Sequence, residues 1–320
     1  MANKVLDNFP GIQKNIPLAN YTTYKIGGPA KYFFNAKNIT ELEKILSLAK
    51  KIKLPVFILG GGSNLLISDK GFKGLVVKIN ILGFEIKENK IYVGAGVQLP
   101  KVAVLASGRG FSGLEWAAGI PGATVGGSIY GHAQAFGTKI SEVIENVKAL
   151  DLKTLKIKSF SKSLCKFSLK NSIFKKNKNL IIVSAELVFE KKNPEETKNK
   201  IKEFLQYRKE KHPSLPSAGS TFVNPEIKIK NKKLLEKYPE LKEFNTAGRI
   251  PAGYLIQKCG LQGKKIGGAQ ISEKHANFIV NNGGAKAKDI LTLIKTAKQK
   301  VKQNFGINLE QEVQMVGFNK

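Results

Sequence analysis

The sequence contains few of the residues that crosslink secreted domains or bind metals. Among its 320 residues are 2 cysteines, 3 histidines and 1 tryptophan. Cys165 and Cys259 lie far apart and lack the short spacing that is typical of metal ligands. We therefore expect no disulfide and no metal site. Free thiols of this kind are usual in a reducing compartment, so we expect the protein to be cytoplasmic.

Long apolar runs are also missing. No segment approaches the roughly 18 consecutive apolar residues that a membrane-spanning helix requires. Residues 1–20 mix charges, proline and asparagine, without the apolar stretch of a secretory signal. We expect no membrane insertion, and the length suggests two or three domains.

Acidic residues are scarce relative to basic ones. The chain has 53 lysines and arginines against 24 acidic residues, a formal net charge of +29. Such an excess can indicate a nucleic-acid partner. However, only Arg109, Arg208 and Arg249 are arginines, and proteins that read bases or clamp phosphates favour the two-pronged guanidinium. Lysines occur along the whole chain, with the densest group, six without an acid, in Lys162–Lys178. We therefore attribute the positive charge to a lysine-rich genome, and we expect no nucleic-acid partner.

The spacing of apolar residues predicts an α+β fold rather than a regular array of βαβ units. Helices are expected over residues 38–54, 99–108, 191–211 and 286–305. Thr40 and Glu43 suggest a capping box for the first helix, and Gly306 a C-cap for the last. Strands are expected at residues 56–59, 75–79, 91–93, 147–152, 181–189 and 308–318.

Two glycine-rich turns are candidates for binding phosphate groups. Gly60–Asn64 follows a predicted strand, and its glycines would let successive backbone N–H groups approach one anion. It matches neither the Walker loop nor the Rossmann fingerprint, and alone it could be a plain tight turn. The second turn, Gly119–Ser128, contains four glycines, and Gly131–Gly137 follows it closely. Two such turns in one domain suit a ligand with a diphosphate and an extended body, such as a flavin dinucleotide.

Several motifs occur in the order that is found in the UDP-N-acetylenolpyruvoylglucosamine reductase family, which the chain resembles over nearly its whole length. These motifs are Tyr21–Gly28, Gly60–Leu66, Gly113–Gly127, Pro216–Pro225, Ile250–Ile256, Lys265–Phe278 and Leu309–Val313. The short connection between residues 189 and 207 resembles the subtype that lacks an extra tyrosine-bearing loop.

The resemblance implies a PCMH-type FAD-binding domain in two lobes, followed by a C-terminal α+β substrate-binding domain. Lobe 1 would comprise residues 1–55, with the C-terminal strand 308–320 as a candidate to join it. Lobe 2 would comprise residues 56–205, and the substrate-binding domain residues 206–307.

The resemblance also implies a reaction, in which NADPH reduces UDP-N-acetylglucosamine enolpyruvate through FAD. The product would be UDP-N-acetylmuramate, a peptidoglycan precursor, and we expect the enzyme to be a monomer. The implied catalytic residues are Ser220 as proton donor, Glu312 and Lys170. Lys170 stands where the family has an arginine. The implied substrate contacts are Lys211, Asn224 and His275.

The implied contacts of FAD come from the opening motif and from both glycine turns. They are Tyr24, Gly60, Gly61, Gly62, Ser63, Asn64, Leu65, Gly119, Ile120, Pro121, Gly122, Thr124, Gly126, Gly127, Ser128 and His132. Three residues at or beside these positions differ from the family pattern. His132 and Gln134 stand where the family usually has Asn and Gly, and Ala123 is an extra residue in the second turn. Together with Lys170, these differences leave open two alternatives. The chain could be a catalytically impaired or differently specific flavin-binding protein, or it could be another flavin oxidoreductase.

Overall fold

The computed structural model describes residues 6–318 and divides the chain into two compact units. Of these residues, the first unit contains 6–16, 29–62 and 72–210. The second contains 17–28, 63–71 and 211–318. The chain therefore passes between the units several times. The expected division into two lobes and a substrate-binding domain, with residues 308–320 as a candidate to join lobe 1, stays a prediction.

The first unit contains a four-stranded sheet whose strand order is β1-β2-β5-β3. The strands are β1 (Gln13–Pro17), β2 (Pro29–Ala36), β3 (Val56–Leu59) and β5 (Phe72–Ile79). Strand β5 pairs in parallel with both β2 and β3. The predicted strand at residues 56–59 is confirmed, and its carboxyl end leads directly into the first glycine turn.

Helix α2 (Ile39–Lys51) connects β2 to β3 in this sheet. Its buried side, Leu42, Ile45, Leu46 and Ala49, has the helical spacing that predicted it. The predicted cap at Thr40 is wrong, because Asn38 caps the helix two residues earlier. Asn38 Oδ1 accepts a hydrogen bond from the Glu41 N–H at 2.9 Å, and its Nδ2 donates to Glu41 Oε1 at 3.0 Å.

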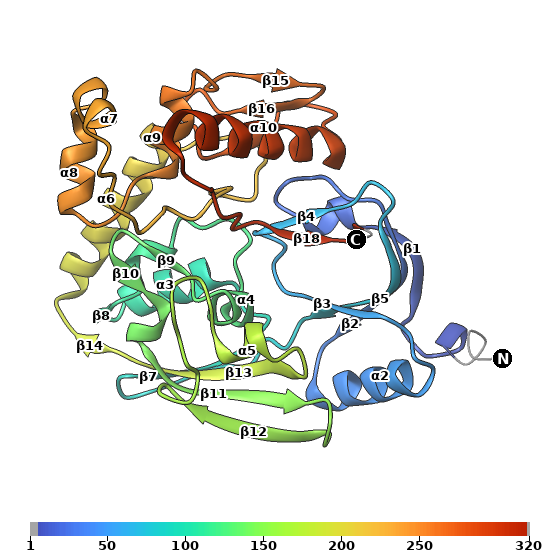
Figure 1. Ribbon diagram of the computed structural model, residues 1–320. Coiled ribbons are helices and arrows are strands. Elements are labelled where there is room, and N and C mark those ends of the chain that lie inside the picture. Colours follow the sequence, from blue (N-terminus) through green and yellow to red (C-terminus); the bar gives the residue numbers. More distant parts are fainter. Residues whose placement is uncertain (1–5, 319–320) are drawn as a thin grey trace. The chain divides into compact units, whose positions relative to one another are not determined.

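A five-stranded antiparallel sheet forms the other part of the first unit, with strand order β12-β11-β13-β7-β6 (Figure 1). The strands are β6 (Phe84–Lys87), β7 (Lys90–Gly94), β11 (Ile144–Asp151), β12 (Lys156–Ser161) and β13 (Leu180–Val188). The helices of this part are α3 (Leu99–Ser107), α4 (Val125–Tyr130), α5 (Ile173–Lys176) and α6 (Pro194–Lys211). One hydrophobic core, centred on side chains such as Trp116 and Phe174, joins both sheets and their helices.

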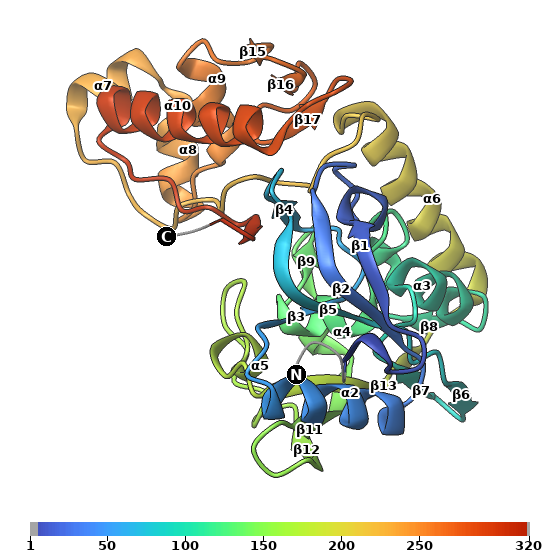
Figure 2. The same cartoon turned by 90° about the vertical axis from the view of Figure 1, so that its right-hand side faces the viewer.

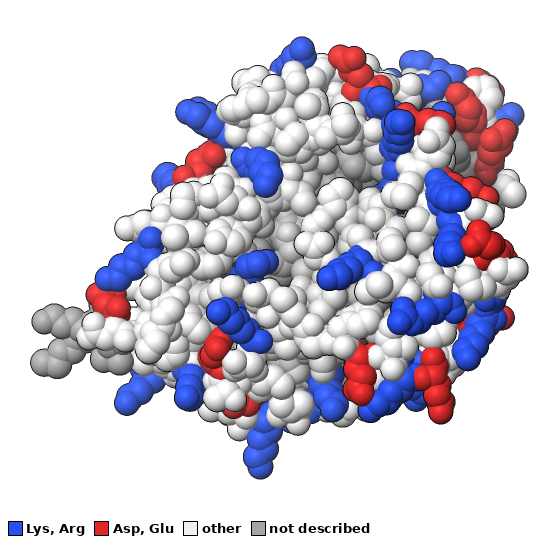
Figure 3. All heavy atoms as spheres, turned by 180° about the vertical axis from the view of Figure 1, so that it is seen from behind, with Lys and Arg blue, Asp and Glu red and all other residues white. Residues whose placement is uncertain are grey.

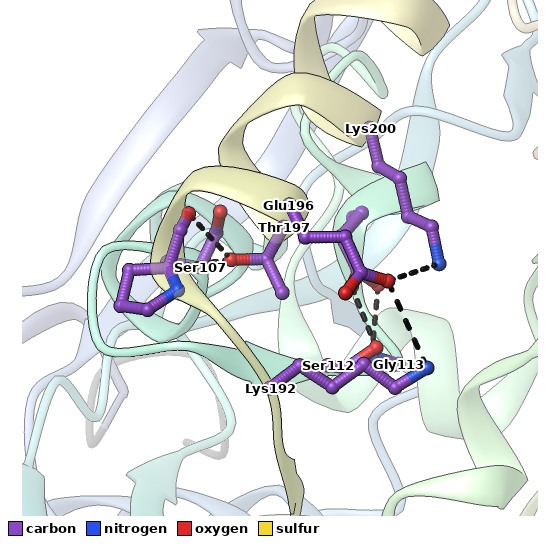
Figure 4. A network of polar contacts seen from close by, with 9 residues as sticks. Ser107, Ser112, Gly113, Lys192, Glu196, Thr197 and Lys200 are labelled. Carbon is purple, nitrogen blue, oxygen red and sulfur yellow. Dashed lines mark hydrogen bonds and ion pairs between the residues drawn. The ribbon is translucent and has the colours of Figure 1, made fainter.

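Helix α6 is fixed at both ends to the segment that carries the second glycine turn. At its start, Thr197 Oγ1 donates to the Ser107 carbonyl at 2.8 Å, where α3 ends (Figure 4). Glu196 on the same turn faces two lysines, and the nearer, Lys200, lies 3.6 Å away. Near its end, Arg208 Nη2 donates to the Trp116 carbonyl at 3.4 Å, just before Gly119.

Helices α7 (Lys232–Lys237), α8 (Glu240–Thr246), α9 (Ala252–Lys258) and α10 (Ala287–Phe305) belong to the second unit. Its three-stranded sheet has the order β15-β16-β17, with β15 (Lys265–Ile266), β16 (Ala269–Ile271) and β17 (Ile279–Asn281) (Figure 2). Gly306, at φ 71°, ends α10 as predicted. A separate core packs α9 and α10 against this sheet through residues such as Ile256 and Ile294.

Long-range pairing explains why residues 63–71 belong to the second unit. Strand β4 (Leu65–Ile67) pairs in parallel with the C-terminal strand β18 (Gln314–Val316). Asp69 then accepts hydrogen bonds from the Ala287 and Lys288 N–H groups, at 2.8 and 3.2 Å, at the start of α10. The predicted strand at residues 308–318 is thus shorter than expected, and its partner is β4.

The distribution of surface charge is relevant to the nucleic-acid partner considered in the sequence analysis. On the face shown in Figure 3, lysine and arginine side chains are scattered among acidic ones instead of forming one stripe. Across residues 6–318, no helix combines the length and apolar character that crossing a membrane requires. The same residues contain no cluster of three or more histidine, cysteine or acidic side chains placed to hold a metal ion.

Candidate active site

Ser220 and Glu312 lie on neighbouring segments of the second unit, although they are far apart in the sequence. Ser220 forms an isolated antiparallel bridge with Phe278. The next residue, Thr221, donates its N–H to the Asn277 carbonyl at 2.7 Å, and its own carbonyl accepts from the Glu312 N–H at 2.9 Å. The backbone therefore places Glu312 beside Thr221, the residue that follows Ser220.

The side chain of Asn277 holds the serine segment in this arrangement. Its side chain is 2% exposed. Its Oδ1 accepts from the Phe222 N–H at 3.0 Å, and its Nδ2 donates to the Phe222 carbonyl at 2.9 Å. Asn277 lies within the motif Lys265–Phe278, but the sequence does not indicate its role, because this contact joins segments that local spacing cannot relate.

The segment that carries Glu312 is also held by the first part of the chain. Asn64 Nδ2 donates to the Glu312 carbonyl at 3.3 Å, and the Asn64 carbonyl accepts from the Gln314 N–H at 3.0 Å. Leu65 follows and pairs with Gln314 in the β4–β18 ladder. Of the residues predicted to contact FAD, Ser63, Asn64 and Leu65 belong to the second unit, and Asn64 and Leu65 contact the segment that carries Glu312.

The predicted substrate contacts Asn224 and His275 lie near the serine segment. Asn224 Oδ1 accepts from the Ala252 N–H at 3.0 Å, at the start of α9. His275 Nδ1 accepts from the Asn277 N–H at 3.2 Å, and burial lowers the pKa of this imidazole. The His275 ring packs edge-on against His212, with their centroids 5.7 Å apart, so two of the three histidines meet. Lys211 directly precedes His212 and is exposed.

Tyr24 belongs to the core of the second unit. Its side chain is fully buried, and burial raises its pKa. Its backbone carbonyl accepts from Asn281 Nδ2 at 3.1 Å, which fixes the opening motif to β17. The structure thus gives Tyr24 a packing role, and contact with a cofactor stays a prediction.

In the first unit, the two glycine turns lie directly against each other. A Cβ atom added to Gly61 would lie 1.6 Å from the Gly122 carbonyl oxygen, and one added to Gly60 would lie 2.9 Å from Thr124 Oγ1. Gly62 and Gly122 have φ angles of 68° and 67°, in the left-handed region that favours glycine. Only glycine therefore allows this contact between the two turns.

The second turn ends in helix α4. Thr124 caps this helix, and its Oγ1 accepts from the Gly127 N–H at 3.3 Å. Gly126 donates its N–H to the Ala95 carbonyl at 2.9 Å, and a Cβ atom there would lie 2.8 Å from Ala95 Cβ. Ser128, 5% exposed, is enclosed on the same helix. The glycines of this turn are thus needed for close backbone packing.

Lys78 is a basic residue at the first turn that the sequence did not single out. It lies on β5, opposite Leu59 of β3. Its Nζ donates to the Gly60 carbonyl at 3.2 Å, and burial lowers its pKa. A partly buried ammonium group favours an anionic partner, because its hydration has been reduced.

Lys170 and His132 belong to the first unit, whereas Ser220 and Glu312 belong to the second. Lys170 has a φ angle of 52° and lies in a tight turn between Ser168 and Asn171. His132 contacts the backbone of that turn, with its Nδ1 2.6 Å from the Ser168 carbonyl oxygen.

Comparisons with known proteins identify the family to which the chain belongs. A family profile described as an FAD binding domain matches residues 30–155, and another, the C-terminal domain of UDP-N-acetylenolpyruvoylglucosamine reductase, matches residues 210–316. The UDP-N-acetylenolpyruvoylglucosamine reductase of Lachnoclostridium phytofermentans is 38% identical over 95% of this chain and 92% of its own length. That of Anoxybacillus flavithermus is 37% identical over 97% of this chain and 96% of its own length. The chain belongs to the UDP-N-acetylenolpyruvoylglucosamine reductase family.

Solved structures support the same assignment for the fold. The crystal structure of UDP-N-acetylenolpyruvylglucosamine reductase from Thermus caldophilus superposes with a TM-score of 0.76 and 29% identity. The match covers 95% of this chain and 99% of that one. The expected fold, a PCMH-type FAD-binding domain with the C-terminal domain of this reductase family, is confirmed.

The glycine turns of the first unit fit the FAD that this family uses. Backbone-to-backbone contact between Gly61 and Gly122 leaves no room for a side chain. Beside this contact, the partly buried Lys78 ammonium supplies positive charge. A diphosphate is suited to such a site, because glycine backbone N–H groups can approach it closely.

Proposed function

We propose that this chain reduces UDP-N-acetylglucosamine enolpyruvate to UDP-N-acetylmuramate with NADPH, in the synthesis of peptidoglycan precursors. Membership of the reductase family, at 37–38% identity over nearly the full length, supports this activity. The structural observation that supports the proposal most directly is the hydrogen bond from the Glu312 N–H to the carbonyl of Thr221, the residue that follows Ser220. FAD, when bound, supplies the hydride transfer from NADPH to the double bond of the substrate.

Ser220 acts as the proton donor in this proposal. The hydride adds to the methylene carbon of the enolpyruvyl group, and negative charge develops on the carbon that bears the carboxylate. The Ser220 hydroxyl then gives its proton to that carbon, completing reduction of the double bond. A serine hydroxyl is a weak acid, so neighbouring groups must stabilise the charge that develops.

Glu312 and Lys170 provide that assistance. Glu312 lies beside the serine segment and acts near the substrate carboxylate. Lys170 contributes positive charge to the carboxylate where the family has an arginine, although a lysine lacks the planar two-pronged donor. Lys211 contacts the diphosphate of the substrate, and Asn224 and His275 also contact the substrate. The hydrogen bond from the Ala252 N–H to Asn224 Oδ1 holds Asn224 at the start of α9.

Replacing Ser220 by alanine tests the proton-donor assignment. We expect the Ser220→Ala variant to be reduced by NADPH at the normal rate, but to reoxidise at least about a hundred-fold more slowly with the enolpyruvyl substrate. Stopped-flow absorbance of the flavin measures the two half-reactions separately. Ser214→Ala, an exposed serine just before the motif, is the matched control. Normal reoxidation of the Ser220 variant would overturn the assignment.

A catalytically impaired flavin-binding protein is the second candidate, and the lysine at position 170 favours it. Restoring the family residue with Lys170→Arg should raise the rate of substrate reduction several-fold if the lysine is a weak substitute. Lys166→Arg is the control, because Lys166 lies in the same segment with a similar φ angle of 46°. An enzyme that shows no turnover of the UDP-sugar, with or without this change, would favour the impaired protein.

We further propose that the enzyme is a cytoplasmic monomer of the subtype that lacks the extra tyrosine-bearing loop. The residues between Phe189 and Tyr207 are taken up by β14 (Glu190–Lys191) and most of α6, which supports the subtype. Cys165 is a buried free thiol, as suits a reducing compartment. Analytical ultracentrifugation of the FAD-loaded protein tests the monomer, and a dimer would contradict it.

A further inference from the structure

His132 is almost fully enclosed in the first unit, at 5% exposure. Its Nδ1 lies 2.6 Å from the Ser168 carbonyl oxygen, and its Nε2 lies 2.8 Å from Ser141 Oγ. Its ring stacks on Phe167, with the centroids 4.8 Å apart and an angle of 28° between the planes. Protein atoms thus contact both ring nitrogens and one face of the imidazole.

These partners define the protonation state of His132. A carbonyl oxygen can only accept, so Nδ1 carries the hydrogen and Nε2 accepts from the Ser141 hydroxyl. Burial is the largest influence and lowers the pKa of His132, and the nearby ammonium groups of Lys139 and Lys170 lower it further. The Ser168 carbonyl and Glu142 act in the opposite direction. The neutral imidazole is therefore the form that suits this position.

The carbonyl that His132 holds belongs to the turn that carries Lys170. Ser168 and Asn171 exchange two backbone hydrogen bonds of 3.0 Å each, so that Leu169 and Lys170 form the loop between them. Lys170 has a φ angle of 52°, which is uncommon for a residue with a side chain. Such a conformation persists only where the surrounding contacts determine it.

The carboxyl end of this turn is held by Tyr130, two residues before His132. Ser172 Oγ donates to the Tyr130 carbonyl at 2.8 Å. Lys175 Nζ donates to the Lys170 carbonyl, also at 2.8 Å. Tyr130 and His132, on either side of Gly131, therefore hold the two ends of the turn that carries Lys170.

Helix α4 connects this clamp to the second glycine turn. The helix has 6 residues, Val125–Tyr130, with Thr124 as its N-cap and Tyr130 at its carboxyl end. At 1.5 Å per residue, it is only about 9 Å long. The proposed FAD turn and the Lys170 turn thus lie at opposite ends of one short helix.

We propose that His132 is a positioning residue for Lys170, not a contact of the flavin as the family resemblance implied. Its two nitrogens are occupied by Ser168 and Ser141, and its hydrogen bond fixes the backbone from which Lys170 projects. A lysine has one flexible ammonium group and lacks the rigid fork of arginine, so its direction depends more on the backbone. The inference rests on the proposed role of Lys170 in substrate reduction.

The test compares His132→Gln with Lys170→Ala in the FAD-loaded enzyme, singly and together. We expect His132→Gln to leave FAD affinity, the visible flavin spectrum and flavin reduction by NADPH unchanged. Reoxidation by the enolpyruvyl substrate should slow about ten-fold in its limiting rate, with little change in half-saturating concentration. If His132 acts through Lys170, adding His132→Gln to Lys170→Ala should have no further effect. Lys139→Gln removes a neighbouring charge without touching these hydrogen bonds, and serves as the control.

Several outcomes separate this inference from the proposed function. A full ten-fold effect of His132→Gln in the Lys170→Ala background, or an altered flavin spectrum, would overturn the positioning role. Normal reoxidation of Lys170→Ala would instead show that Lys170 is not catalytic. Nitrogen NMR of the three histidines in the wild-type holoenzyme tests the placement without activity, since His132 should carry its hydrogen on Nδ1. If His132→Gln fails to fold, Ser141→Ala provides the milder variant, with a smaller slowing of the same step expected.

Discussion

The side-chain amide of Asn277 pairs with both backbone groups of Phe222, accepting from its N–H at 3.0 Å and donating to its carbonyl at 2.9 Å. Phe222 is two residues beyond Ser220, and the residue between them accepts the hydrogen bond from Glu312. One buried asparagine thus holds the segment that carries the proposed proton donor.

Asn277→Ala should destabilise the protein and slow substrate reduction. It leaves a buried N–H and a buried carbonyl without partners, each costing about 1–3 kcal/mol in the free energy of unfolding. Chemical denaturation and the rate of flavin reoxidation by substrate measure the two effects. Asn281→Ala is a matched control, because this asparagine is also buried but contacts Tyr24 and the turn before α10. Equal slowing of reoxidation in the two variants would contradict a specific role for Asn277.

Gly61→Ala should abolish FAD binding or weaken it by at least about ten-fold. The added Cβ would lie 1.6 Å from the Gly122 carbonyl oxygen, so the two turns must separate. Fluorescence titration of the flavin-free protein with FAD measures the loss. Gly83→Ala in the same unit adds a Cβ that meets no atom within 4 Å, and should bind FAD normally. Unchanged affinity of the Gly61 variant would exclude the contact between the turns as a requirement for FAD.

Lys78→Met should weaken FAD binding about ten-fold, equivalent to about 1.4 kcal/mol. The substitution keeps most of the side-chain length, but removes the ammonium that donates to the Gly60 carbonyl at 3.2 Å. It also removes positive charge that would attract a diphosphate. The control is Lys73→Met, an exposed lysine on the same strand. If both variants bind FAD with the same affinity as the wild type, Lys78 has only a structural role.

Stability should fall as the pH decreases from about 7.5 to about 5.5. Burial lowers the pKa of both His132 and His275. Below the ordinary imidazole pKa of about 6.5, the unfolded state therefore binds more protons than the native state, and stability rises with pH. Each histidine contributes at most about 1.4 kcal/mol per pH unit. Denaturation of wild type and His132→Gln across this range checks the sign, and a smaller slope is expected for the variant. Equal slopes would show that His132 does not contribute.

Much of the chemistry could be predicted from residues that lie close together in the sequence. The glycine turns at Gly60 and Gly119 could be predicted because closely spaced glycines indicate a close approach of the backbone, which is a local requirement. The apolar spacing of α2 and α10 predicted both helices for a similar reason. The cap of α2 was placed wrongly because Asn38 and Thr40 are both good caps, and only the contact of Asn38 with Glu41 distinguishes them.

The sequence alone thus determined the family, the helices and strands with strong periodicity, and the types of residue that could carry the reaction. The tertiary structure decided which segments meet: β4 with β18, Asn277 with Phe222, and His132 with the turn that carries Lys170. These pairs are separated by long stretches of chain. Their hydrogen bonds depend on the packing of whole units, and local spacing carries no information about that packing. The family resemblance implied a flavin contact for His132, and the protein partners of both its nitrogens, which support the proposed positioning role, could be seen only in the structure.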